Sequence, residues 1–201
     1  MSVLLSLALF LTPLHLAPLH FDTGKFNIFQ DGKKIGSEEY TISPHDGGYS
    51  VEGHTQIKVQ EQAFDLKSQM ELNTALQTKS YEFQSQGNSI RLNVGDPVSE
   101  LEYLVGGKSE PHDVRFPADG AIVDTNFFHH YMILIYRAAL GLKSVAAFVP
   151  QQLTIGTMTI QTTGDHTWQF DTGNVKVIAT TDNEDRMIRL TVPSAKVVVE
   201  R

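Results

Sequence analysis

The sequence predicts a mainly β protein in which a long antiparallel meander curls into a half barrel, or an open barrel, around one buried α-helix. Three observations support this fold class. Apolar and polar residues alternate along most of the chain, turn residues separate the alternating runs, and one long apolar segment, Asp124–Leu140, interrupts the pattern. A period of two is what a strand with one buried and one solvated face requires.

The first half of the chain has the pattern of a meander of strands. Between Tyr49 and Gln60 every second residue is apolar or small, and the residues between them are polar. Turn residues such as Asp31-Gly32, His45–Gly48 and Gly106-Gly107 lie between the runs. Because a parallel crossover needs about a dozen residues, these short connections predict antiparallel neighbours.

The same pattern returns after Leu140, in the segments "TMTIQTTG", "HTWQFDTGNVKVIAT", "RMIRLTV" and "AKVVVE". The two halves together predict roughly a dozen strands, since each run has the usual length of a strand. Twist accumulates by roughly 20–25° for each strand pair, so a sheet of this size curls. The curled sheet provides a trough for the segment that breaks the pattern.

That segment is predicted to be a helix, with Asp124 or Thr125 as its N-cap and Gly141 as its left-handed end. Its residues leave almost no polar stripe. A helix that is apolar nearly all round has to be covered on most sides. The helix is therefore expected to fill the trough of the sheet.

Composition limits the partners that the protein can bind. The chain has 201 residues and a net charge of −7, with 16 Lys and Arg against 23 Asp and Glu. Nucleic acid is an unfavourable partner because binding to phosphates depends on concentrated basic residues. We find no linker or internal repeat, and we expect residues 21–201 to form a single β-rich domain.

Residues 1–20 are predicted to be a signal peptide. Their uncharged apolar run, Val3–Leu11, is shorter than the roughly 20 residues that cross a bilayer and fits the apolar core of a signal peptide. The alternatives are a first strand of the fold, or a coding sequence that begins upstream of Met1. The expected location is therefore the periplasm or the extracellular space. The chain has no cysteine, so it has no site for a lipid anchor, and we expect no stable membrane anchor.

Motifs for catalysis and metal binding are weak. His129 and His130 are adjacent, whereas ligands on one face of a helix lie three or four residues apart, and neither has a helical co-ligand downstream. One of them is expected to bond a loop carbonyl and the other to lie at the edge of the trough. "FDTG" occurs twice, but Lys25 and Asn174 follow where aspartic proteases have Ser, Thr or Ala. We therefore expect no enzyme, no metal and no cofactor.

The apolar residues around the helix are the candidate binding residues. Each of them taken singly is expected to be core. Taken together they allow a second interpretation, in which sheet and helix do not close completely and leave an apolar cleft for a ligand. His129 or His130 would then meet a polar head group at the rim. The candidate ligand-binding residues are Phe127, Phe128, His130, Tyr131, Met132, Tyr136 and Trp168.

The stretch "FNIFQDGKKIGSEEYTI", the glycine-punctuated meander with "SYEF" and the segment "DTNFFHHYMILI" resemble the DUF3108-like group of exported bacterial β-rich proteins. The likeness covers the layout of residues 24–150. The architecture also resembles that of the periplasmic lipoprotein carriers, in which a half barrel closed by helices shelters acyl chains. The resemblance implies the same half barrel here, and it supplies no catalytic residues.

Three functional hypotheses follow from the sequence. The first is an exported, non-enzymatic protein that binds a lipid or lipid-linked envelope component in an apolar trough. The second is an envelope interaction or scaffold protein with a fully packed core, no ligand and a sheet edge that pairs with a protein partner. The third is an enzyme that uses His130 with an acid such as Asp124.

Overall fold

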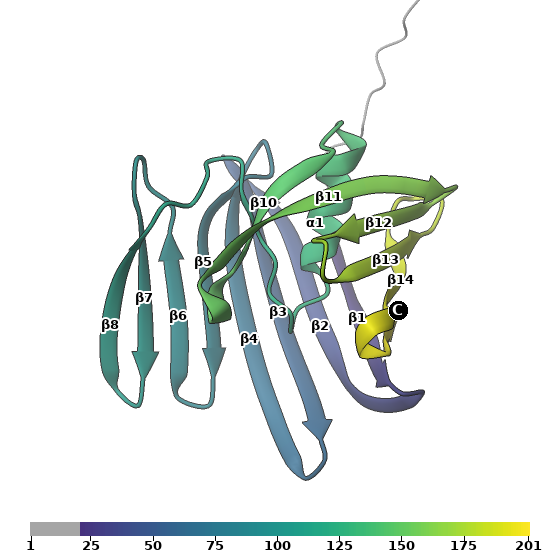
Figure 1. Ribbon diagram of the computed structural model, residues 1–201, viewed down its shortest axis with the longest axis horizontal. Helices are drawn as coiled ribbons and strands as arrows, with labels where there is room; N and C mark the ends of the chain where they lie inside the picture. The colour runs from purple at the N-terminus through teal and green to yellow at the C-terminus, as the bar shows by residue number, and fades with distance from the viewer. Residues whose placement is uncertain (1–20) are drawn as a thin grey trace, which may run out of the picture.

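The computed structural model describes residues 21–201, and the predicted signal peptide lies outside the described residues. In this part of the chain one 15-stranded sheet contains every strand, in the order β8 to β1 followed by β15 down to β9. All neighbours are antiparallel except β9 and β10, which are parallel. The predicted mainly β class and the curled, open sheet around one helix are confirmed, with 15 strands where about a dozen were expected (Figure 1).

The elements follow the chain with short connections. The strands of the first meander are β1 (Asp22–Gln30), β2 (Lys33–His45), β3 (Gly48–Val59), β4 (Gln62–Asn73), β5 (Thr78–Ser85), β6 (Asn88–Asn93), β7 (Ser99–Val105) and β8 (Lys108–Val114). The helical region follows with β9 (Ala121–Ile122) and α1 (His130–Ala139). The second meander has β10 (Ser144–Val149), the 3-10 turn η1 (Pro150–Gln152), β11 (Thr154–Gly164), β12 (Thr167–Asp171), β13 (Lys176–Thr181), β14 (Met187–Val192), η2 (Pro193–Ala195) and β15 (Val197–Glu200).

The first and last strands join the two meanders edge to edge. β1 pairs with β2 on one side and with β15 on the other, where Asn27 lies opposite Glu200 and Gln30 opposite Val197. Next to this seam the Arg201 guanidinium contacts the Asp22 carboxylate at 2.7 Å. The two ends of the described chain therefore lie side by side in the middle of the sheet.

The second meander folds back over the inner face of the first. The Tyr103 hydroxyl on β7 donates to the Pro150 carbonyl at the start of η1. The Tyr81 hydroxyl on β5 donates to the Asp124 carboxylate, just before the helix, at 2.5 Å. Figure 1 shows α1 between the two halves, with β10 and β11 crossing in front of β3–β5. The edge strands β8 and β9 do not pair with each other, so the sheet stays open.

The alternation seen in the sequence separates the two faces of the sheet. On β3 the residues Val51, Gly53 and Thr55 are buried toward the helix, and the residues between them face away from it. Burying apolar side chains on the inner face is the main source of stability, at roughly 25 cal/mol per Å² of apolar surface. The largest fully buried side chains of the core are Tyr81, Phe26, Phe127, Phe148, Phe170, Ile28, Ile42, Leu72, Leu92, Leu101, Met132 and Leu134.

The helix is shorter than the sequence predicted. It begins at His130, so the expectation of an N-cap at Asp124 or Thr125 was wrong. The Asp124 carboxylate accepts a hydrogen bond from the Asn126 amide at 2.8 Å, a local turn that competes with helix formation. The predicted end is confirmed, because Gly141 adopts φ +104° just after the helix.

The helix acts as the centre of the core, and this can be tested with Met132→Ala. The Met132 side chain is 1% exposed, so its truncation should lower the free energy of unfolding by about 2–5 kcal/mol. Urea denaturation followed by the fluorescence of Trp168 measures the change. Ile188→Ala on β14, where the side chain is 40% exposed, is the control and should cost less than half as much. Equal losses would contradict a helix-centred core.

Candidate functional site

The Glu38 carboxylate on β2 is completely buried and holds the start of the helical segment. Its Oε2 accepts the backbone N–H of Phe128 at 2.7 Å. Its Oε1 accepts the backbone N–H of His129 at 2.9 Å and contacts the His129 ring Nδ1 at 2.8 Å. A carboxylate is stabilised at a helix N-terminus because unpaired amides and the helix dipole both favour negative charge there. Glu38 therefore anchors the helix to the sheet.

Two neighbours on β3 complete this anchor. The Thr55 hydroxyl donates to the Asn126 carbonyl at 3.0 Å and lies 3.4 Å from the Glu38 carboxylate. At Gly53 an added Cβ would lie 2.3 Å from Cε1 of the His129 ring. Gly53 has to lack a side chain because the imidazole rests directly on the backbone of β3.

A second cluster of buried polar residues surrounds Asp124. Its carboxylate accepts hydrogen bonds from the Tyr81 hydroxyl, the Asn126 amide and the Gln151 side chain. Burial and the Asp124 charge raise the pKa of Tyr81 well above its usual value, so the phenol keeps its proton and donates it. This cluster ties β5, the loop before the helix and η1 together.

His130 is held neutral inside this second cluster. Its Nδ1 lies 3.3 Å from the backbone N–H of Asp124 and accepts from it. Burial, together with the neighbouring His129, lowers the pKa of His130 well below its usual value. His129 and His130 are 0% and 1% exposed. His129 bonds a carboxylate and His130 a backbone amide, so the expectation of a loop carbonyl was wrong.

The apolar residues proposed as a ligand site pack against the sheet. Phe127, Tyr131 and Met132 are buried, as is His130, while Phe128, Tyr136 and Trp168 are half-buried. The crevice recorded between the helix and the sheet, at Met70, His130 and Leu134, has a volume of about 10 Å³. That is about the room of a single water. The seven residues predicted from the sequence therefore lie together around the helix, four of them buried in the core and three half-buried.

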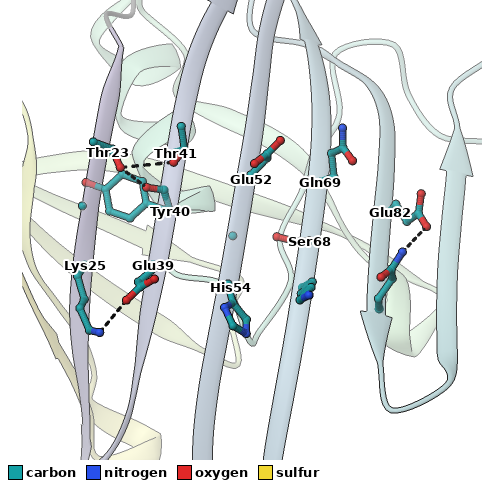
Figure 2. Close-up of a pocket in the computed structure, with 14 residues that line it drawn as sticks. Thr23, Lys25, Glu39, Tyr40, Thr41, Glu52, His54, Ser68, Gln69 and Glu82 are labelled. Carbon is teal, nitrogen blue, oxygen red and sulfur yellow. Dashed lines mark hydrogen bonds and ion pairs between the residues drawn. The ribbon is translucent and has the colours of Figure 1, made fainter.

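A large hollow lies on the opposite, outer face of the sheet. It is a groove of about 700 Å³ that crosses β1 to β5. The register of these strands places its lining in two rows. One row consists of Thr23, Thr41, Glu52, Gln69 and Glu82 (Figure 2). The other row consists of Lys25, Glu39, His54, Lys67 and Gln84. The groove therefore runs across the strands, with one row of side chains on each side.

The side chains at the two ends of the groove are already paired. Lys25 contacts Glu39 at 2.7 Å, and this hydrogen bond and charge lower the pKa of Glu39. At the other end the Glu82 carboxylate accepts from Gln84 at 2.8 Å and from Arg91 at 3.2 Å. The hydrogen bond from Gln84 is the main cause that lowers the pKa of Glu82. These contacts hold the ends in place.

Most of the side chains at the centre of the groove have no such partners. Glu52 on β3 and Lys67 and Gln69 on β4 make no side-chain hydrogen bond or ion pair with any described residue. His54 uses Nε2 for Asp65 at 3.0 Å, which leaves its other ring nitrogen for a ligand. The groups that can bind a ligand are therefore concentrated on β3 and β4.

The groove and the helix anchor lie on opposite faces of β3. Gly53 and Ser68 line the floor of the groove, and a Cβ added at Gly53 would meet both the His129 ring and the Ser68 hydroxyl. The Ser68 hydroxyl is buried and has no hydrogen-bond partner among the described residues. Only the backbone of β3 separates the groove from the imidazole.

Sequence reasoning missed this groove. The alternation correctly placed Glu52, Lys67 and Gln69 on the wet face, where polar residues are expected by default. The signal that could have found the groove is the register: with the turns known, the polar residues of neighbouring strands fall into line. That register depends on turn lengths and bulges, such as the one between Ile28 and Phe29.

Residues 21–201 contain neither a metal-binding cluster nor a helix that could span a membrane. In this part of the chain no three His, Asp or Glu side chains gather closely enough to hold a metal ion. The helix of the described region does not have the length and apolar character needed to cross a membrane.

Comparison with known proteins supports the fold alone. No family model matches the chain, and no curated protein matches it. A solved structure, a DUF1089 family protein from Pseudomonas aeruginosa, is similar with a TM-score of 0.51 and 10% sequence identity. The similarity covers 79% of this chain and 90% of the other. The chain thus has the fold of an uncharacterised β-rich family.

Glu38→Gln tests the anchor. The amide keeps the size of the side chain but loses the charge and one acceptor, so the free energy of unfolding should fall by about 3 kcal/mol. Glu39→Gln is a matched control, because this neighbour is exposed and water screens its ion pair with Lys25, so its loss should have little effect on stability. Urea denaturation of both variants measures the difference, and a similar loss for the two would refute the anchor.

The pH dependence of stability tests the neutral His130. The unfolded chain binds a proton on this residue near pH 6.5, whereas the folded chain does not, since burial lowers the pKa. The contribution of His130 to the free energy of unfolding should therefore be constant above that pH and fall below it, by up to about 1.4 kcal/mol per pH unit.

His130→Asn should flatten this slope, because asparagine has no group that titrates. The fold should persist, because the amide oxygen can still accept from the Asp124 backbone. The groups that face the ring, His129, Tyr81 and Asp124, stay in place. The exposed His166→Asn serves as the control and should keep the wild-type slope. If His130→Asn also keeps it between pH 5 and pH 8, the buried imidazole is not its source.

Proposed function

We propose that the protein is an exported, non-enzymatic binding protein that holds an elongated polar molecule in the groove across the outer face of β1 to β5. The observation that carries the proposal is the groove itself, about 700 Å³ in volume and lined by polar side chains from all these strands. Ligands bind in concave sites where a few polar groups converge. The free side chains on β3 and β4 supply those groups.

The chemistry of the groove favours binding over catalysis. The pKa values of Glu39 and Glu82 are both lowered by their partners, so these carboxyls stay ionised. A carboxyl that acts as a general acid needs the opposite shift. The imidazoles of His129 and His130 are buried beneath the sheet and do not reach the groove. His130 also meets Asp124 through the backbone amide, not through the carboxylate that an acid–base pair would use.

Pairing of a protein partner with the sheet edge has less support. The edge strand β8 is exposed along nearly its whole length and carries Lys108, Glu110, Pro111 and Asp113. Charged residues and proline on an edge strand oppose pairing with another chain. The groove is therefore a better candidate for the binding surface than this edge.

The apolar ligand expected from the sequence stays a prediction. A lipid beside the helix would have to displace buried side chains such as Met132, because the crevice there has a volume of about 10 Å³. The assignment to the DUF3108-like group is part of the proposal as well. It rests on the sequence of β1 and β2 and of the segment that leads into the helix.

Titration of the ¹⁵N-labelled protein tests the proposal by NMR. Three probes are added in turn: a mixture of neutral oligosaccharides, a mixture of short peptides, and lauric acid. We expect one of the polar probes to shift the amides of Glu52, Gly53, Lys67 and Gln69, which lie at the centre of the groove.

A pair of variants provides the control. Gln69→Trp fills the groove and should abolish these shifts, whereas Glu100→Trp, on the outer face of β7 and outside the groove, should preserve them. If lauric acid shifts only the amides of α1, the ligand site is the apolar cluster around the helix, and the groove proposal is wrong. No shift with any probe would also overturn the proposal.

A further inference from the structure

The groove carries charges of both signs. Two lysines, Lys25 and Lys67, and three glutamates, Glu39, Glu52 and Glu82, line it, so the lining has one net negative charge. Arg91 on the next strand lies outside the lining and contacts both Glu82 and Glu102. A polyanion would meet the three carboxylates, and a polycation would meet the basic groups. The electrostatics therefore favour a ligand without net charge.

The unpaired side chains at the centre combine donors with acceptors. Lys67 can only donate, Glu52 can only accept, and Gln69 does both. A ligand that satisfies all three along a short length needs groups that can act in either role. Hydroxyl groups meet this requirement at every position, whereas a peptide offers donors and acceptors on separate atoms.

The dimensions of the groove fit a single extended chain. Neighbouring strands lie about 4.8 Å apart, so the path from β1 to β5 is roughly 19 Å long. Side chains two residues apart on one strand are about 7 Å apart, which sets the separation of the two rows. The groove is therefore much longer than it is wide.

From these observations we infer that the ligand of the groove is a neutral, hydroxyl-rich chain of the oligosaccharide class, bound at its centre by Glu52, Lys67 and Gln69. This inference rests on the proposed function and specifies the ligand. The Tyr40 ring at the floor is 2% exposed and offers no face for stacking. Binding therefore depends on hydrogen bonds to the side chains at the centre of the groove.

A panel of linear hexamers tests the inference. The neutral saccharides are the β-1,4-linked glucose, the α-1,4-linked glucose and the N-acetylglucosamine hexamers. Hexagalacturonate is the polyanion, hexalysine the polycation, and a glycine–serine hexapeptide the neutral peptide. Each is titrated into the ¹⁵N-labelled protein, and the shifts of the groove amides give the affinity. We expect saturable shifts with at least one neutral saccharide and weaker ones with the other three probes.

Substitutions at the centre should then weaken saccharide binding. Glu52→Ala and Gln69→Ala should each raise the Kd about tenfold, the loss of one hydrogen bond to a charged or well-placed group. Glu100→Ala and Lys79→Ala, exposed positions outside the groove lining, should leave the Kd unchanged. Because all four side chains lie on the solvated face, the fold should persist, and circular dichroism checks this.

The outcomes separate this inference from the proposed function. If the peptide, hexagalacturonate or hexalysine binds in the groove more tightly than every saccharide, the inference is overturned and the binding groove stands. If a saccharide binds but Glu52→Ala and Gln69→Ala have no effect, the assignment of the centre is wrong. If none of the probes shifts the groove amides, both proposals fail.

Discussion

A carboxylate buried between a sheet and a helix has to be surrounded by donors, and the position of Glu38 is set by this requirement. The donors are the amides of Phe128 and His129 and the His129 ring, at distances of 2.7 to 2.9 Å. Removing an ionised group from water costs several kcal/mol, so the arrangement is stable only when all these contacts form together. The start of the helix is consequently fixed against β2 and β3 at one place.

The outer groove is built over this anchor. Because the His129 ring rests on β3, the position beneath the groove can only be Gly53, and the adjacent Ser68 on β4 is also small. The inner face of these strands thus contacts the helix. The outer face carries exposed side chains that make no contact with the core. Glu52, Lys67 and Gln69 are such residues, which makes them available for binding.

The sequence predicted the strands well because their alternation is a local property. It also predicted that residues such as Phe127 and Met132 would be covered. The helix start could not be predicted, since it depends on Glu38, which is 91 residues from His129 in the chain. The groove was missed for a related reason: it exists only when five strands are in register, and no single strand shows it. Whether the helix leaves room for an apolar ligand depends on packing, which alternation does not determine.

If Glu38 holds the amides of Phe128 and His129 in the folded protein, these two amides are protected from solvent. Native-state hydrogen exchange measures that protection residue by residue. We expect both to exchange as slowly as the amides of the inner strands, such as Val51 and Leu66, and to exchange much faster in Glu38→Gln. Exchange in the wild type as rapid as that of Gly106 and Gly107 in the β7–β8 turn would contradict the anchor and the account built on it.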